Sequence, residues 1–594
     1  MRHAKCPPGK DAPLSETIAR GTRLLAEMNL DAGPVSWLNP APQCWSVHFQ
    51  VEGCPPLASN GKGTSREACL AGALGEFFER LATNFYFSDY FLDNSDTAAT
   101  APDFLFYPDE QWFPCSPEEP PPAENHQGIA LFGDGLRQFY DPDDQLTAAD
   151  LADHNTDPAQ GGICALPFTN LETGQKIFLP VGVLSNLYVS NGMAAGNSAT
   201  EASAQALAEI LERHVKNQVI AEGLSLPEVP SSRLHQLPGV VATIARLRER
   251  ALELRILDAS LGGQFPVICA LLSNHRTGGA CAAFGASCRF AGAIERTVTE
   301  LLQGRSLEML DDFPPLCHDQ QEVADLFNLE SHFVNGAGLL AWRMFRDQPD
   351  FTPAQWDFHG DSRTEWQQLL RLVHTRGFAV YRAEYRHCGI YTCRLVVPGM
   401  SEIYPVDDLL YNNRASAGQL RGELLDLTKK GKEELAKLLL LIDSLSLSDR
   451  QLVAEAIGVL FPPDSAWAGL TLGELKALLQ LAIGRREGAL AWCSWCLDQG
   501  VLADNRLRLF QLLQTILLLE SRGEQFSAYR QNLGLFYRED ELARAEAVLG
   551  GNLRFPGLTG ASSWTALSAD HRRLQEIYQR QNQRKAAWSK HQPR

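Results

Sequence analysis

Five polar side chains recur along one face of a predicted helix that follows a glycine-rich stretch at residues 192–196. At about 100° per residue, the helix brings these carboxylates and amides onto one stripe, with apolar residues on the opposite side. Asn197 and Ser198 stand where the helix begins and are residue types that cap helix N-termini. The stripe comprises Asn197, Glu201, Gln205, Glu209 and Glu212, with Arg213 at its edge. Taken alone, this pattern is more typical of an exposed helix than of a functional site.

The same spacing occurs a second time, 133 residues earlier in the chain. Segment 63–80 aligns with segment 196–213 without gaps, and both end in the pattern A-L-x-E-x-x-E-R. In the earlier copy the acids are Glu76 and Glu79. A third fragment ends in Arg296 and is followed one turn later by Glu300. Because the copies repeat their acids and not only their leucines, we expect one site assembled from several elements.

Facing the two E-x-x-E-R helices against each other would gather four carboxylates in one cleft. Two unit charges roughly 4 Å apart, at an effective dielectric constant of about 20, repel by about 4 kcal/mol, so such a cluster needs cations. Oxygen ligands without cysteine or histidine favour a hard ion, Mg²⁺ before Mn²⁺ or Ca²⁺. The alternative is that neighbouring arginines such as Arg80 and Arg213 neutralise the acids in plain ion pairs.

Mg²⁺ usually also binds phosphate oxygens, and the arginines, lysine and amides of the repeats are residue types that hold phosphates. Neither common nucleotide-binding loop is present, however. The segment N-G-K-G at 60–63 lacks the upstream glycine of a P-loop, and G-x-G-x-x-G fails at Arg66. A nucleotide site here is therefore of another type, and no catalytic nucleophile or general base is identified.

The composition places limits on the class of protein. With 594 residues, the chain is expected to form two or more domains. A net charge of −18 argues against extensive nucleic-acid binding, which needs a basic surface. We find no apolar signal segment at the start and no membrane-spanning stretch, and the fourteen cysteines are scattered as reduced core thiols would be. These features predict a cytoplasmic protein.

Helices and strands alternate over the first 410 or so residues, which predicts an α/β or α+β domain. The Pro- and acid-rich stretch 104–127 is expected to be a loop. Helices are predicted at 12–28 and 291–304, in addition to the two E-x-x-E-R helices. Strands are predicted at 44–51, 254–259, 266–273, 280–286, 378–385 and 391–397, and a strand-rich segment at 176–190.

From about residue 431 the pattern becomes almost wholly helical, and segments 472–483 and 489–498 form a hairpin of tetratricopeptide-like length. Cys493 and Cys496 form an isolated C-x-x-C on an apolar helix, which favours buried thiols over a zinc or redox site. The basic tail 572–594 is expected to be a helix with a solvated face.

Four segments carry a resemblance to a known family. The segments that resemble the YcaO proteins are PGKDAPLSETIAR, NGKGTSREACLAGALGEFFERLATNFYF, NLYVSNGMAAGNSATEASAQALAEILERHVKN and GAIERTVTELLQGR. The similarity extends over nearly the whole chain. The resemblance implies a distinct ATP- and Mg²⁺-dependent fold at 1–412, followed by the helical region at 431–594.

The resemblance also implies roles for individual residues. The implied metal ligands are Glu76, Glu79, Glu209, Glu212 and Glu300. The implied nucleotide contacts are Lys10, Thr17, Arg20, Asn197, Glu201, Gln205, Arg213 and Arg296. The chain departs from the family at two of these regions: Thr17 replaces serine but keeps a hydroxyl, whereas Ala194 replaces serine and loses one.

Family members that form azolines use ATP to phosphorylate a peptide amide carbonyl, and they end in a proline-rich tail that organises their active site. This chain instead ends AAWSKHQPR. The resemblance therefore implies a helper in the β-methylthiolation of an aspartate on a small-subunit ribosomal protein, beside a radical methylthiotransferase. The alternatives are an ATP-dependent enzyme that activates an amide carbonyl and a non-catalytic structural protein. We expect the helical region to mediate homodimerisation or partner binding.

Overall fold

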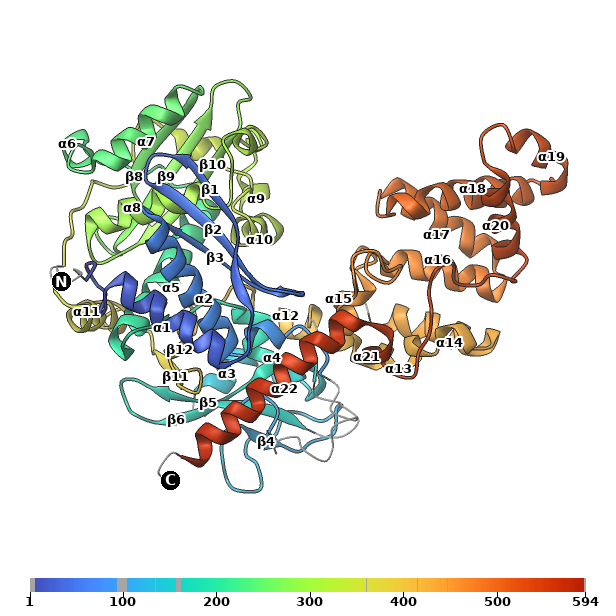
Figure 1. Ribbon diagram of the computed structural model, residues 1–594, viewed down its shortest axis with the longest axis horizontal. Helices are drawn as coiled ribbons and strands as arrows, with labels where there is room; N and C mark the ends of the chain where they lie inside the picture. Colours follow the sequence, from blue (N-terminus) through green and yellow to red (C-terminus); the bar gives the residue numbers. More distant parts are fainter. Residues whose placement is uncertain are drawn as a thin grey trace.

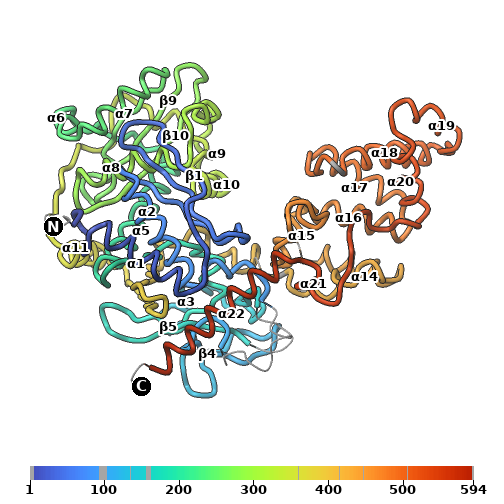
Figure 2. The backbone as a smooth tube through the Cα atoms, in the orientation of Figure 1, coloured from blue at the N-terminus to red at the C-terminus, as the bar shows by residue number. Residues whose placement is uncertain are grey.

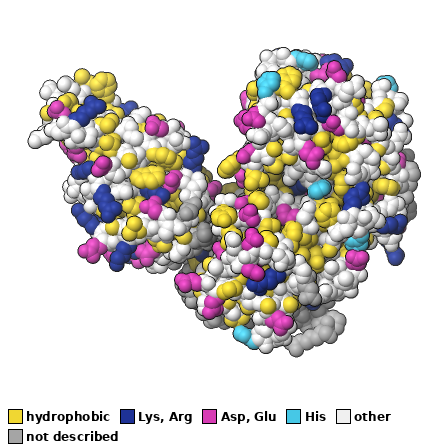
Figure 3. Space-filling view, turned by 180° about the vertical axis from the view of Figure 1, so that it is seen from behind, with side chains coloured by type: hydrophobic (Ala, Val, Ile, Leu, Met, Phe, Trp, Pro, Cys, Tyr) yellow, Lys and Arg dark blue, Asp and Glu magenta, His cyan; other side chains and the backbone are white. Residues whose placement is uncertain are grey.

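The computed structural model describes residues 6–92, 104–133, 135–155, 162–358, 360–413, 415–445 and 447–591. These form a large body of helices and sheets and a smaller helical arm that projects from one side (Figures 1 and 2). Lys/Arg and Asp/Glu side chains are interspersed over both parts on the face shown in Figure 3. No helix within the described ranges has the length and apolarity needed to cross a membrane.

The first sheet of the body positions the first E-x-x-E-R helix. It is an antiparallel meander of β1 (Ala32–Ala41), β2 (Cys44–Val51) and β3 (Cys54–Gly63). Val47, Phe49 and Val51 alternate along β2 and are buried. Helix α2 (Arg66–Ala82) begins three residues after β3 and packs against this sheet, and α1 (Leu14–Glu27) packs against α2.

A second antiparallel sheet comprises β8 (Leu252–Asp258), β9 (Val267–Asn274) and β10 (Ala280–Ala286). Its strands are almost entirely buried because helices cover both faces. Helix α8 (Phe290–Leu301) packs on β9 and β10 and carries the third acidic fragment.

The second E-x-x-E-R helix packs against the third sheet. Its strand order is β4 (Gln111–Phe113), β5 (Ile163–Asn170), β11 (Tyr381–Tyr385), β12 (Tyr391–Val396) and β7 (Met193–Gly196), with β6 (Lys176–Pro180) paired to β5. Helix α5 (Ala199–Glu222) follows β7 and packs against β12 and against α11 (Ser362–His374). Every ladder between these strands is antiparallel, so the described body has the α+β form of the predicted fold.

Two predictions of secondary structure are wrong in part. The stretch 104–127 is not loop throughout, since β4 lies within it and pairs with β5. The strand predicted over 176–190 ends at Pro180, and α4 (Val181–Val183) and a π-helical turn, η4 (Leu184–Tyr188), follow. Most residues of that segment are buried on all sides, so apolar periodicity does not separate a strand from a helix there.

The helical arm has its own core. Its longer helices are α14 (Lys432–Ser444), α16 (Leu472–Ile483), α17 (Arg486–Asp498), α18 (Asp504–Ser521), α19 (Phe526–Leu533) and α20 (Glu539–Leu549). Helices α16 and α17 pack as the predicted hairpin, and Cys493 and Cys496 are buried in the arm's core, as expected. The tetratricopeptide-like character of the arm remains a prediction.

The last helix, α22 (Ala569–Lys590), runs from the arm back across the body (Figure 1). Leu574, Ile577 and Tyr578 on α22 are buried in the core of the body. The Lys585 ammonium donates to Asn84 Oδ1 (2.6 Å) and to the Phe106 carbonyl (2.8 Å). One face of this helix is therefore buried in the body, while positions such as Glu576 and Gln583 form the exposed face that the basic residues predicted. Residues 592–594 of the predicted tail lie outside the described residues.

The remaining α-helices of the described residues are shorter. They are α3 (Leu136–Tyr140), α6 (Ser231–Leu234), α7 (Pro238–Arg248), α9 (Gln320–Val323), α10 (Leu326–Val334), α12 (Asp408–Tyr411), α13 (Leu420–Leu425), α15 (Val453–Ile457) and α21 (Trp564–Leu567).

Candidate functional site

The two E-x-x-E-R helices begin in the same way. The Ser65 hydroxyl caps α2 by accepting from the Ala68 N–H (3.2 Å), and the Ser198 hydroxyl caps α5 by accepting from the Glu201 N–H (3.1 Å). The matching glycines Gly63 and Gly196 lie so close to their helices that an added Cβ would come within 2.8 Å of atoms of the first turn. Each copy is thus a strand, a tight glycine entry and a serine-capped helix.

A cavity of about 790 Å³ lies between α2, α5 and α8. All five glutamates predicted as metal ligands line it: Glu76 and Glu79 from α2, Glu209 and Glu212 from α5, and Glu300 from α8. The structure therefore brings together acids that are up to 224 positions apart (Glu76 and Glu300). One concave site built from three helices is what the repeated acids predicted.

Basic side chains in the cavity pair with most of these acids. Arg80 lies 2.5 Å from Glu76 and Arg213 lies 3.0 Å from Glu209, both at i,i+4 spacing. Arg296 lies 3.7 Å from Glu212, and Lys62 contacts Glu300. With the side chains in these positions, no three acidic, histidine or cysteine side chains of the described residues form a metal-binding group. The metal role of the five glutamates stays a prediction.

Glu79 is the acid least compensated by these pairs. Its side chain is buried, and burial, followed by repulsion from Glu209 and Glu76, raises its pKa well above the usual value. Burial also raises the pKa of Glu76, and it lowers the pKa of Lys62 and of Lys216 to about 8. A divalent cation beside Glu79 would relieve its repulsion from Glu209 and Glu76.

Several buried guanidinium nitrogens of the cavity lack hydrogen bonds. These atoms are Arg80 Nε, Arg213 Nη1 and Arg296 Nε, as judged over the described residues. Leaving a buried charged donor unsatisfied is costly, and phosphate oxygens are acceptors that fit such donors. The cavity therefore offers both halves of a metal–phosphate site, carboxylates for a hard cation and guanidinium groups for an anion.

The predicted nucleotide contacts divide into two groups. Lys10, Gln205, Arg213 and Arg296 line the cavity. Lys10 Nζ donates to Gln205 Oε1 (3.0 Å) and lies 3.3 Å from Glu201 Oε1.

The other four predicted contacts do not line the cavity. Asn197 donates to Glu201 (3.2 Å) and accepts from the Thr17 hydroxyl (3.3 Å), so these three residues form a network beside Lys10. Arg20 donates to the Gly389 carbonyl (2.5 Å) instead. Ala194 is fully buried on β7 opposite Cys393, away from the cavity wall.

Sequence reasoning missed some cavity residues. Lys62 belongs to the N-G-K-G segment that fails as a P-loop, yet its ammonium faces Glu300. Lys216 lies one turn after Glu212 and extends the polar stripe of α5, which was a signal for it. Segment 332–336 also lines the cavity, and Phe333 lies under the Arg213 guanidinium (4.8 Å). No repeated motif marks that segment.

Comparisons with known proteins were made against families, individual proteins and solved structures. Residues 60–401 match a family model described as the ATP- and Mg²⁺-binding YcaO cyclodehydratase, and residues 417–587 match the YcaO cyclodehydratase C-terminal domain. The chain is 41% identical over 589 residues to the ribosomal protein S12 methylthiotransferase accessory factor YcaO of Escherichia coli, covering 98% of this chain and 99% of that one.

Two further matches are one relative and one solved structure. An uncharacterised protein of Haemophilus influenzae is 40% identical over 551 residues, 92% of each chain. The solved structure of YcaO from Methanopyrus kandleri bound with AMPPCP and Mg²⁺ aligns at 17% identity with a TM-score of 0.37, covering 66% of this chain and 91% of that one. With a TM-score this low, the family assignment rests on the sequence matches.

Proposed function

Because the chain belongs to the YcaO family, we propose that it uses ATP and Mg²⁺ to assist a radical methylthiotransferase that modifies a small-subunit ribosomal protein. The observation that carries this proposal is the 41% identity to a protein named as an accessory factor for the S12 methylthiotransferase. The match covers 99% of the length of that protein. The modification is the β-methylthiolation of an aspartate, as the resemblance implies.

The chemistry of the cavity fits an ATP–Mg²⁺ complex. Glu76, Glu79, Glu209, Glu212 and Glu300 would hold the cations, and Lys10, Gln205, Arg213 and Arg296 would hold the nucleotide. The buried guanidinium nitrogens that lack hydrogen bonds and the raised pKa of Glu79 support this assignment. When bound, ATP supplies a phosphoryl group whose transfer Mg²⁺ assists. The network of Thr17, Asn197 and Glu201 would position Lys10, with Arg20 holding α1 to the Gly389 loop.

The position of α22 supports an accessory role over azoline formation. Its residues pack on the body's core, and none of its described residues lines the 790 Å³ cavity. The described part of the C-terminal segment, up to residue 591, thus lies outside this cavity, whereas the resemblance implies that azoline-forming members use a proline-rich tail to organise their active site.

A second candidate function is the ATP-dependent activation of a peptide amide carbonyl by phosphorylation. The cyclodehydratase name of the matched family favours it. The two candidates differ in product, since amide activation leaves an altered peptide backbone whereas methylthiolation leaves an altered side chain.

We assign the arm to protein contacts. The helices from residue 431 up to the start of α22, with their predicted tetratricopeptide-like arrangement, would bind a second copy of the chain. The methylthiotransferase would also dock on this chain. Leu535 and Phe536 at the tip of the arm are 79% and 73% exposed, which supports a contact there. The buried free cysteines support a reducing, cytoplasmic location.

The modification state of ribosomal protein S12 tests the proposal. In a strain lacking this chain, mass spectrometry should show a loss of the methylthiolated form. Wild type should restore it, whereas Glu209→Gln should not. Unchanged methylthiolation in the deletion strain would reject the accessory role, and a backbone modification in its place would favour the second candidate.

A further inference from the structure

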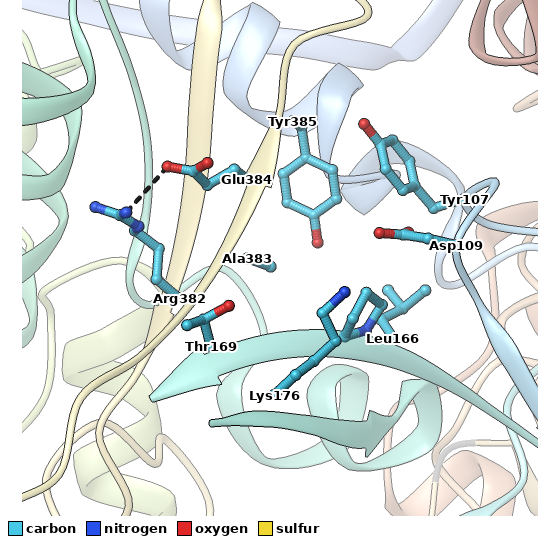
Figure 4. Close-up of a pocket in the computed structure, with 10 residues that line it drawn as sticks. Tyr107, Asp109, Leu166, Thr169, Lys176, Arg382, Ala383, Glu384 and Tyr385 are labelled. Carbon is cyan, nitrogen blue, oxygen red and sulfur yellow. Dashed lines mark ion pairs between the residues drawn. The ribbon is translucent and has the colours of Figure 1, made fainter. Parts of the chain in front are cut away.

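A second cavity, of about 250 Å³, lies in the body between β5, β6, β11 and the segment before β4 (Figure 4). It shares no lining residue with the 790 Å³ cavity. Ligand pockets for drug-sized molecules start at about 300 Å³, so this cavity suits a smaller ligand and not a nucleotide. Leu166 and Ala383 contribute an apolar wall.

Two opposite charges face each other across this cavity. The Lys176 ammonium and the Asp109 carboxylate both point toward its centre (Figure 4). Burial raises the pKa of Asp109, and attraction from Lys176 partly offsets that effect. Among the described residues, the Lys176 ammonium and the Asp109 carboxylate nevertheless do not form an ion pair with each other at 4.0 Å or less. Both residues are also exposed to solvent, so the gap between them opens to the surface and can take a ligand that carries both charges.

The Tyr385 hydroxyl points into the same gap (Figure 4). Tyr385 is 4% exposed, and no other group of the described residues forms a hydrogen bond with this hydroxyl. Burial raises its pKa, so it stays protonated and can donate. Tyr107 packs edge-on against its ring, with centroids 5.1 Å apart, which fixes the hydroxyl in place.

The remaining charges at this cavity already have partners. Glu384 lies 3.1 Å from Arg382 and 3.6 Å from Arg386, and it accepts from the Tyr391 hydroxyl. Lys176, Asp109 and Tyr385 thus offer a ligand one cation, one anion and one neutral donor, and the Thr169 and Tyr107 hydroxyls also belong to the lining.

We propose that this cavity binds a free α-amino acid, with its ammonium group against Asp109 and its carboxylate against Lys176 and the Tyr385 hydroxyl. An α-amino acid carries its ammonium and carboxylate groups on the same carbon atom, and its size agrees with the cavity. The site is separate from the ATP–Mg²⁺ site and does not depend on the function proposed above.

Calorimetry of the full-length protein with each of the twenty L-amino acids at millimolar concentration tests the proposal. At least one should bind wild type, and Lys176→Met, Asp109→Asn and Tyr385→Phe should each weaken that binding at least tenfold. Tyr385→Phe keeps the ring packing, so it separates a lost hydrogen bond from a lost fold. Lys437→Met, at an exposed lysine of the arm, is the control and should bind as wild type.

The N-acetyl and amide derivatives of the amino acid that binds test the need for both charges. Each derivative should bind at least tenfold more weakly than its parent. The proposal is overturned if no amino acid binds, if binding survives in the Lys176 and Asp109 variants, or if the N-acetyl derivative binds as well as its parent. The last result would indicate a site for a carboxylate alone, as on an acidic peptide side chain.

Discussion

The side chains of the large cavity are balanced between acids and bases, and Glu209 is central to that balance. It pairs with Arg213 (3.0 Å) and also repels Glu79. Glu209→Gln keeps the shape of the side chain but removes its charge. We expect the affinity for Mg²⁺-ATP to fall at least tenfold, about 1.4 kcal/mol, while the Tm without ligand does not fall because the repulsion is relieved.

Thermal unfolding and calorimetry on the same preparations check this prediction. Glu27→Gln is the control because Glu27 pairs with Arg23 at i,i+4 spacing on the surface (3.7 Å). Wild-type affinity in Glu209→Gln would show that the acidic stripe is only an ion-paired face.

His332, at the edge of the cavity, gives the protein a dependence on pH. It is 2% exposed, its Nε2 lies 3.0 Å from the Leu339 carbonyl, and burial lowers its pKa from 6.5 to about 4. Between pH 4 and 6.5 this histidine therefore binds more protons in the unfolded state than in the folded state. The unfolding free energy rises with pH across this window, and the contribution of His332 is lost on acidification. The expected loss is on the order of 3 kcal/mol.

Denaturant unfolding at several pH values measures this contribution. The difference in unfolding free energy between wild type and His332→Gln should change between pH 6.5 and pH 4. His318→Gln, at an exposed histidine, should track wild type throughout. A constant difference between wild type and His332→Gln would contradict the assignment.

Among the elements, the two E-x-x-E-R helices were predictable, whereas the docking of the last helix on the body was not. The acids of α2 and α5 repeat at a fixed spacing after a glycine and a serine cap, so sequence alone grouped them. The position of Lys62 in the cavity was not predicted because its segment was compared only with the P-loop pattern. The docking of α22 could not be predicted because its buried face is interrupted by the polar residues Lys585 and Asn582, whose partners lie 501 and 477 positions earlier.

The packing of α22 predicts how a substitution there acts. Ile577 is fully buried in the core of the body, so Ile577→Ala should lower the unfolding free energy of the body by about 3 kcal/mol. Chemical denaturation followed by body tryptophan fluorescence measures this loss. Leu535→Ala, at an exposed leucine of the arm, should leave it unchanged. An equally stable Ile577→Ala variant would show that α22 contributes little to the body.

At the scale of the whole molecule, the arm is expected to join two copies of the chain. Deleting everything from residue 431 would also remove α22 from the body's core, so point substitutions are the cleaner test. The double variant Leu535→Ser and Phe536→Ser should convert a dimer to a monomer in light scattering. A matched double variant at the exposed Leu326 and Phe327 of the body should stay dimeric. A monomeric wild type would reject the predicted dimer.

The central claim is that one cavity binds ATP through cations held by the repeated glutamates. Calorimetry of wild type with ATP, in excess Mg²⁺ and again in excess EDTA, tests it most directly. We predict binding in Mg²⁺ that weakens at least tenfold in EDTA. Equal affinity under the two conditions, or no binding in Mg²⁺, would contradict the account.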